Sequence, residues 1–310
     1  MIGRRRMIAI TAGAGLATAL GPRARAVAPT VPLHRWTGIA LGASASITIA
    51  HDDAPRLVAL AQAEIERLEA IFSLYRTDSA LSRLNAAGHL AAPPFEMLEL
   101  LSLCDTLHGL TGAAFDPTIQ PLWALYARRH AEGASPTAAE IEATRQLIGW
   151  GLVDVAPDAV VLKKPGAALS LNGIAQGYIA DRVADLLRGQ GVSDVLVDMG
   201  EIVALGHRPD GRPWNVGLAD VADPERATSF RRLSNSAIAT SAPLGTVFDR
   251  AGAVGHILDP RTGRPGGKWR QVSVIAPQAA RADGLSTAFC LMEEVDIQRA
   301  SAGVEVLLTA

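Results

Sequence analysis

The spacing of hydrophobic residues changes near position 150, and this change constrains the fold more than any other feature of the chain. Before it, apolar residues recur at the intervals of a helix with one buried face, most clearly over residues 54–72. After it, short β-branched runs are separated by turn residues, which is typical of strands. Helices followed mainly by strands indicate the α+β class rather than a regular alternation of parallel strands and helices.

The first part of the chain is expected to hold one strand and then helices. Residues 33–50 alternate between polar and apolar side chains and predict the strand. Asp52 or Asp53 can cap the helix that follows, and Pro93-Pro94 opens the next one. The predicted helices cover residues 54–72, 93–112, 118–130 and 135–148.

The second part is expected to be mostly strands. They are predicted at residues 153–155, 160–162, 167–171, 194–199, 202–205, 214–219, 231–236, 272–275 and 304–308, with helices at 174–187 and 282–292. Pro157-Asp158 would join the first two strands as a hairpin. We therefore predict a single α+β domain over residues 27–310, with mixed or antiparallel sheets and flanking helices.

Residues 1–26 have the order of a secretory signal. Arginines at positions 4–6 precede an apolar run over residues 7–20, which is too short to span a bilayer, and Ala24-Arg25-Ala26 forms a small-residue cleavage site. The paired arginines favour the twin-arginine export route. An ordinary secretory signal and an uncleaved anchor are the alternatives. We expect the signal to be removed and the mature protein to be periplasmic.

The composition excludes several classes of protein. Hydrophobic residues make up 49% of the chain and the mean hydropathy is +0.20, so the chain can bury a large core and is not disordered. Its 29 basic and 31 acidic residues give no charge pattern for nucleic acid. No transmembrane span is expected in the mature chain. Cys104 and Cys290 are expected to be buried free thiols, although an oxidising compartment permits one disulfide.

Residues 170–178, with the sequence SLNGIAQGY, lie between a predicted strand and a predicted helix. Glycines at such a turn let the backbone approach a ligand, and the N-terminus of a helix favours negative charge. The spacing of Gly173 and Gly177 differs from the dinucleotide-binding pattern. A tight turn that only packs the helix on the strand is the alternative.

Asp283 and Thr287 are four residues apart and would share one face of a helix. A carboxylate and a hydroxyl on one face suit a hard cation such as Mg²⁺, which takes oxygen ligands and keeps waters or phosphate oxygens. The alternative is that Asp283 caps the helix and Thr287 bonds to the preceding turn.

Two further segments carry residues that could do chemistry. His256 ends an extended segment and begins the turn-rich run of residues 256–265, where it could act as a base. Residues 112–117 form a loop that offers the aromatic ring of Phe115 and the carboxylate of Asp116.

These segments, taken in order, resemble the ApbE family of FAD:protein FMN transferases. The family pattern is matched at residues 75–85, 112–118, 170–178, 240–241, 256–265 and 282–287. Because the matches run in one order over nearly the whole mature chain, chance agreement is a poor explanation.

The resemblance implies an α+β domain that binds FAD in a cleft, with Mg²⁺ on its pyrophosphate. By position, the metal ligands would be the Gly173 carbonyl, Asp283 and Thr287, with Ser286 close by. FAD would contact Tyr75, Ala114, Phe115, Asp116, Ser170, Gln176 and the backbone near Leu258. His256 would be the general base for the hydroxyl of the acceptor serine or threonine.

Three positions depart from the family pattern: Ser170 stands where an aspartate is usual, and Gln176 where a lysine is usual. The third is Leu41, before Gly42, where a methionine is common; this change conserves volume. The loss of an acid together with a base indicates that a neutral hydrogen-bonding pair replaces a charged one. Residues 171–177, together with the signal, resemble the branch of the family that accompanies nitrous-oxide reductase systems. That branch implies a membrane flavoprotein as the acceptor.

The implied reaction is transfer of FMN from FAD to the acceptor, with release of AMP. The first alternative is an FAD pyrophosphatase, in which water replaces the acceptor hydroxyl. The second is a flavin-binding accessory protein without turnover, which the departures at Ser170 and Gln176 favour. The presence of Asp283, Thr287 and His256 argues against that second alternative.

Overall fold

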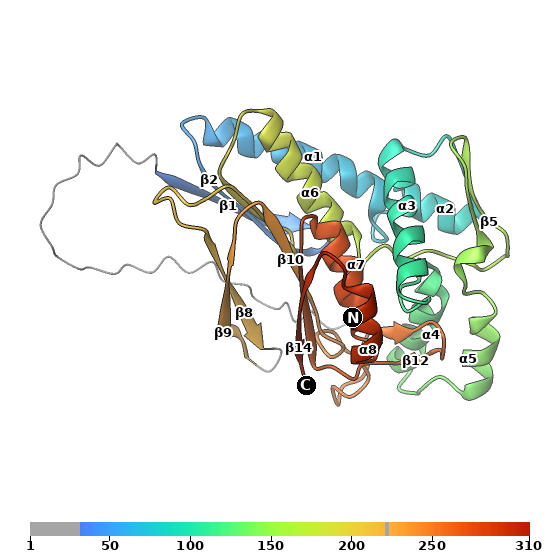
Figure 1. Ribbon diagram of the computed structural model, residues 1–310. Coiled ribbons are helices and arrows are strands. Elements are labelled where there is room, and N and C mark those ends of the chain that lie inside the picture. The colour runs from blue at the N-terminus through green and yellow to red at the C-terminus, as the bar shows by residue number, and fades with distance from the viewer. Residues whose placement is uncertain (1–31, 221–222) are drawn as a thin grey trace, which may run out of the picture.

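A seven-stranded sheet forms the centre of the computed structural model, which describes residues 32–220 and 223–310 (Figure 1). The predicted signal at residues 1–26 lies outside the described residues. All neighbouring strands of the sheet are antiparallel. Their order is β1 (Leu33–Ala40), β2 (Ala43–Ala50), β6 (Val195–Asp198), β7 (Ile202–Leu205), β10 (Ser236–Ser241), β13 (Gln271–Ala276) and β14 (Glu305–Thr309).

Helices cover one face of this sheet. They are α1 (Ala54–Phe72), α6 (Ala175–Gly189), α7 (Ala279–Phe289) and the short α8 (Glu294–Ala300). Alternate strand residues such as Val197 and Val203 point to this side and join the main hydrophobic core. The helix of residues 54–72 is confirmed with its predicted bounds, and Asp53 is its N-cap residue, although its side chain makes no capping bond.

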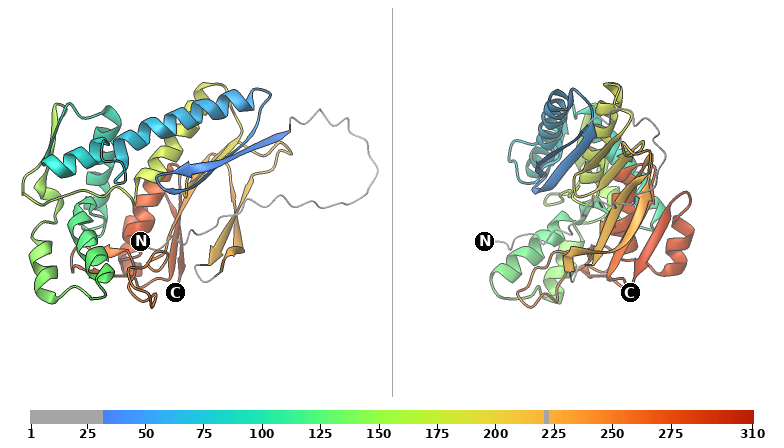
Figure 2. Two further views of the ribbon diagram at one scale, coloured as in Figure 1. Left: turned by 180° about the vertical axis from the view of Figure 1, so that it is seen from behind. Right: turned by 90° about the vertical axis from the view of Figure 1, so that its left-hand side faces the viewer.

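A hairpin of β8 (Trp214–Asp220) and β9 (Asp223–Leu233) covers the opposite face. Leu196, Ile202 and Ile238 of the sheet pack there against Trp214 and its neighbours in a second, smaller core. In the left view of Figure 2, this hairpin (gold) and the green helices of residues 95–145 lie on opposite sides of the red strands. Side chains on both faces of the central strands are therefore buried, which explains why these strands are apolar without strict alternation.

The remaining elements form a group beside the sheet (Figure 1). The group contains α2 (Ala80–Ala87), α3 (Phe95–Leu110), α4 (Gln120–Ala131), α5 (Ala138–Arg145), the single turns Pro117–Ile119 and Trp150–Leu152, and a small sheet of β3 (His89–Ala91), β5 (Ala159–Leu162) and β4 (Val153–Val155). The predicted hairpin at 153–162 is confirmed. A two-residue pair, β11 (Leu258–Asp259) with β12 (Arg264–Pro265), also lies near these helices.

Helices α6 and α7 are held together closely. The Asp181 carboxylate on α6 accepts the backbone N–H groups of Ala279 and Ala280 at 2.8 and 2.9 Å, and so satisfies the first turn of α7. Gly177 permits this approach, because a Cβ at that position would overlap the carbonyl of Ala279. These contacts fix α7 relative to the first turn of α6.

The prediction of a single α+β domain is confirmed, and three local predictions are wrong. Residues 33–50 form two strands, because the chain turns at Leu41 and Gly42, whose φ angles are 47° and 76°. Residues 167–171 are extended but belong to no strand; the Asn85 amide bonds both backbone groups of Leu169 instead, at 2.7 and 2.8 Å. Residues 231–236 span the end of β9, a turn at Asn235 and the start of β10.

The helix α2 was not predicted, because its eight residues are too short to establish a helical period. No helix among the described residues is long and apolar enough to cross a membrane. Cys104 and Cys290 are both buried free thiols, as predicted, and burial raises the pKa of each.

Candidate active site

A cavity of about 510 Å³ opens where β6 turns into β7, and it brings together most of the predicted site residues. Strands β1, β2 and β10, the first turn of α6, the middle of α7 and several loops form its walls. The predicted residues that line it are Ala114, Phe115, Asp116, Ser170, Gly173, Gln176, His256, Leu258, Asp283 and Thr287. Segments more than a hundred residues apart in sequence thus meet at one place.

We call Gly173, Asp283 and Thr287 the helix wall of the cavity. Asp283 is the fifth residue of α7, so it is not the cap of that helix. It is 4% exposed, accepts the Gly177 N–H at 3.2 Å, and burial raises its pKa to about 7. Gly173 lies against Thr287, because a Cβ on Gly173 would be 3.1 Å from the Thr287 hydroxyl oxygen.

A chain of hydroxyl groups supports Thr287. Ser241 contacts the hydroxyl oxygens of Ser286 at 2.7 Å and Thr287 at 3.3 Å. Ser286 also donates to the backbone oxygen of Asp283 at 3.0 Å. Ser286 is fully buried and does not line the cavity, so the structure places it behind the helix wall.

Two acids beside the helix wall were not predicted. Glu201 is 8% exposed and accepts the Thr240 N–H at 3.2 Å; burial, and then the negative charge of Asp283, raise its pKa well above the usual range. Asp198 ends β6 and accepts the Gly200 N–H at 3.1 Å, and burial raises its pKa to about 6. The sequence did contain a signal for them: Asp198 and Glu201 lie at the junction of two otherwise apolar strands, where a buried acid is unusual.

The donor set of the helix wall fits a hard divalent cation. It offers a carboxylate and a hydroxyl, with backbone oxygen close by, and a second buried acid, Glu201, lies near Asp283, so a cation would stabilise the negative charge that burial disfavours there. Gln176 does not neutralise this charge, since its amide donates to the Met199 carbonyl at 2.9 Å. Within the described part of the chain, no three His, Cys, Asp or Glu side chains form a metal site by themselves. A cation here would need phosphate or water oxygens as further ligands.

His256 lines the cavity from the loop before β11. Its Nδ1 lies 3.0 Å from the Thr246 carbonyl and 3.3 Å from the Pro243 carbonyl. Because carbonyl oxygens only accept, Nδ1 must carry a proton in both contacts. In the neutral ring, Nε2 is then the basic nitrogen, which is the tautomer that a general base requires.

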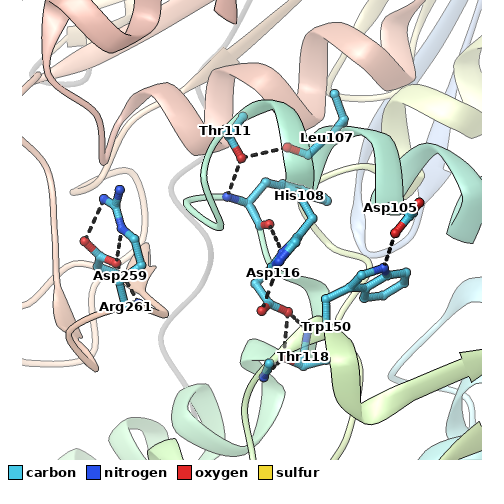
Figure 3. A network of polar contacts seen from close by, with 11 residues as sticks. Asp105, Leu107, His108, Thr111, Asp116, Thr118, Trp150, Asp259 and Arg261 are labelled. Atoms are coloured by element: carbon cyan, nitrogen blue, oxygen red, sulfur yellow. Dashed lines mark hydrogen bonds and ion pairs between the residues drawn. The ribbon is translucent and has the colours of Figure 1, made fainter.

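Asp116 is held rigidly at another wall of the cavity (Figure 3). One carboxylate oxygen accepts the backbone N–H and the hydroxyl of Thr118 at 2.8 and 2.6 Å. The other lies 3.7 Å from Nδ1 of His108, which also contacts the Phe115 carbonyl at 3.1 Å. Burial raises the pKa of Asp116, and these contacts oppose the shift.

Tyr75 is the predicted contact that lies outside the cavity. Its side chain is 61% exposed and stands beside the turn at Gly42, so it does not line the cavity in this structure.

The strands β1 and β2 also line the cavity with residues that were not predicted, among them the polar residues Arg35, Thr37 and Ser46. We call these three the strand floor. Thr37 pairs with Ser46 across the two strands, and Ser46 pairs with Asp198 on β6. Directly paired residues share one face of a sheet, so Thr37, Ser46 and Asp198 form one row. Arg35 is two residues before Thr37 and lies on the same face.

Comparison with known proteins identifies similar sequences and structures. The ApbE family is the family whose model matches this chain, over residues 41–308. A FAD:protein FMN transferase of Vibrio cholerae is 33% identical over 247 residues, which cover 75% of this chain and 73% of that protein. The flavinyl transferase ApbE of Pseudomonas stutzeri has a similar structure, with a TM-score of 0.77 and 30% identity over 89% of this chain and 90% of that one. The ApbE protein of Thermotoga maritima gives a TM-score of 0.81 at 26% identity, over 89% and 94% of the two chains.

Proposed function

This chain belongs to the ApbE family and is a flavin transferase, and we propose that the cavity described above is where it moves FMN from FAD to a serine or threonine of an acceptor protein. One observation carries the placement of this reaction. A buried carboxylate, Asp283, lies beside Gly173 and Thr287 in the same cavity that His256 lines.

In the proposed reaction, the acceptor oxygen forms a bond to the phosphorus of the FMN half. The bond from that phosphorus to the bridging oxygen breaks, and AMP leaves with the bridging oxygen. The proton of the acceptor hydroxyl passes to Nε2 of His256, while the Thr246 and Pro243 carbonyls hold Nδ1–H and keep the ring oriented.

Mg²⁺ would be held by the Gly173 carbonyl, Asp283 and Thr287, and it would offset the negative charge of the pyrophosphate. The other predicted contacts would position FAD. Phe115 offers an aromatic face, and the bonds from Thr118 and the contact with His108 orient the Asp116 carboxylate. Ser170, Gln176, Ala114 and the backbone at Leu258 complete the proposed contacts, and Tyr75 would have to reach FAD from outside the cavity.

We also propose that the protein is exported to the periplasm through its N-terminal signal. The order of arginines 4–6, apolar residues 7–20 and Ala24-Arg25-Ala26 supports this proposal. The segment of residues 171–177 supports membership of the branch that accompanies nitrous-oxide reductase systems, with a membrane flavoprotein as the acceptor. Replacing the three arginines by lysine should block export by the twin-arginine route, and unchanged export would favour an ordinary secretory signal.

The reaction is tested by incubating the mature protein with FAD and Mg²⁺, with and without a peptide that contains a target threonine. Transfer predicts AMP and flavinylated peptide in equal amounts. AMP and free FMN, with no labelled peptide, would make the protein an FAD pyrophosphatase. Bound FAD that stays intact in both samples would make it a flavin-binding accessory protein.

A further inference from the structure

The strand floor has a charge character opposite to that of the rest of the cavity. Among the described residues that line the cavity, Arg35 is the only lysine or arginine, and Asp116, Asp198, Glu201 and Asp283 are the acids. The Arg35 side chain is exposed into this space, and no hydrogen bond or ion pair holds it within the described residues.

The Arg35 guanidinium nevertheless lies close to the row of polar side chains. Its positive charge lowers the pKa of Asp198, which opposes the effect of burial on that carboxyl. Asp198 is two strands away from β1, a separation of about 10 Å between strand axes. Arg35, Thr37 and Ser46 also line the same cavity from one face of the β1–β2 pair, so the guanidinium and the two hydroxyl groups share one space.

We propose that Arg35, Thr37 and Ser46 form a subsite for an oxyanion, separate from the cation site proposed at the helix wall. A guanidinium and two hydroxyl groups donate hydrogen bonds and suit a phosphate or carboxylate group. Because no acceptor among the described residues engages the Arg35 guanidinium, a ligand can bind it without first breaking an ion pair to them. The assignment rests on the proposed function only for the identity of the two molecules that can supply the oxyanion.

Two sources share this chemistry: a phosphate of the donor nucleotide and a carboxylate next to the target threonine of the acceptor. The strand floor belongs to the outermost pair of strands of the sheet, and β1 has no further strand partner among the described residues. A segment of another protein can therefore approach it from the side. The two sources are separated by measuring binding of each molecule alone.

The test compares wild type with Arg35→Gln, and uses Arg232→Gln as the matched control. Arg232 is also exposed and lies on a strand, and its side chain has no hydrogen bond or ion pair among the described residues, but it is outside the cavity. Affinities are measured at equilibrium, with Mg²⁺, for AMP, FAD, riboflavin and two labelled peptides in which aspartate or asparagine precedes the target threonine.

A donor phosphate at the subsite predicts that Arg35→Gln weakens AMP and FAD binding by about 10-fold and leaves riboflavin binding unchanged. An acceptor carboxylate predicts a similar loss for the aspartate peptide and none for the asparagine peptide. Arg35→Lys should recover part of the affinity, because lysine keeps the positive charge but cannot donate two parallel hydrogen bonds as the planar guanidinium does. Thr37→Val and Ser46→Ala should each weaken the same ligand by a smaller factor.

The proposal is overturned if Arg35→Gln binds all these ligands as Arg232→Gln does. Because these are binding measurements, the outcome does not depend on turnover. A wild-type protein that neither transfers FMN nor releases AMP would refute the proposed function and leave this test intact.

Discussion

The helix wall and the strand floor face the same cavity, but the protein holds them in different ways. Asp283 is buried on a helix, and its carboxylate is bonded to the first turn of a second helix. Arg35 is exposed on an outer strand and engages no protein acceptor among the described residues. The helix wall is thus preorganised before any ligand arrives, whereas the strand floor can adjust to what binds.

Preorganisation of the helix wall has a cost in stability. Burying Asp283, Glu201 and Asp198 raises the pKa of each, which means that the folded state disfavours their charged forms. Such a cluster weakens the domain at neutral pH unless a cation binds. The strand floor carries no comparable cost, because an exposed guanidinium keeps its hydration.

The largest expected effect is therefore on the helix wall. Asp283→Asn should reduce Mg²⁺-dependent AMP release by about 10³-fold or more, because it removes the proposed charged ligand of the cation. The amide oxygen can still accept the Gly177 N–H, so the fold should remain intact. AMP release at saturating FAD over a range of Mg²⁺ concentrations measures this effect.

The same variant tests the stability argument by its dependence on pH. The pKa of Asp283 is raised from 3.8 to about 7 in the folded state, so its stabilising contribution is complete below about pH 4 and is lost as the pH rises through 7. Without Mg²⁺ at pH 8, Asp283→Asn should melt at least as high as wild type, and the difference should vanish toward pH 4. A variant that melts lower at pH 8, yet turns over normally, would make Asp283 a structural residue.

The second effect concerns His256. His256→Asn should slow transfer by about 10²–10⁴-fold, the usual contribution of a general base, with little change in FAD affinity. The rate should recover in part at higher pH, where the acceptor hydroxyl needs less assistance. The transfer rate of wild type and variant is measured in single-turnover reactions with a threonine peptide at saturating FAD. An unchanged rate would remove His256 from the mechanism and make Asp116 the next candidate.

The sequence predicts the helix wall well because its residues come in fixed local patterns. Asp283 and Thr287 are one helical turn apart, and Gly173 precedes a helix, so local spacing alone places them on defined faces. It does not predict that α6 and α7 cross at Gly177, which depends on contacts between segments about a hundred residues apart.

The strand floor was missed for a physical reason. Alternation over residues 33–50 fits one strand as well as two, because the turn at Leu41-Gly42 lacks the Asn-Gly or Asp-Gly pair that marks a tight hairpin. Without that turn, Thr37 and Ser46 are not known to be partners, and Arg35 reads as an ordinary surface residue. Cross-strand pairing is a tertiary property that no local spacing encodes.

The third effect tests how closely α6 and α7 pack against each other beside the helix wall. Gly177→Ala should destabilise the protein by about 1–3 kcal/mol, because the added methyl would overlap the Ala279 carbonyl and push α7 away from α6. Gly189→Ala is the matched control: it is on the same helix with nothing within 4 Å of the added carbon, so it should be neutral or slightly stabilising. Thermal melting of both variants decides the matter, and equal melting temperatures would show that the helices are loosely packed.

The smallest effect is expected from restoring the charged pair that the family usually carries. Gln176 donates to the Met199 carbonyl next to the buried acids, so Gln176→Lys would place an ammonium group there and compete with the cation. Ser170→Asp alone would add another negative charge to the cavity. Each single variant should therefore lose more activity than the double variant, in which the two new charges offset each other.

We expect a coupling of about 0.5–3 kcal/mol in a double-mutant cycle on the transfer rate, with the double variant within about 10-fold of wild type. Strictly additive losses would show that Ser170 and Gln176 act independently, and that their joint departure from the family pattern is not a compensated exchange.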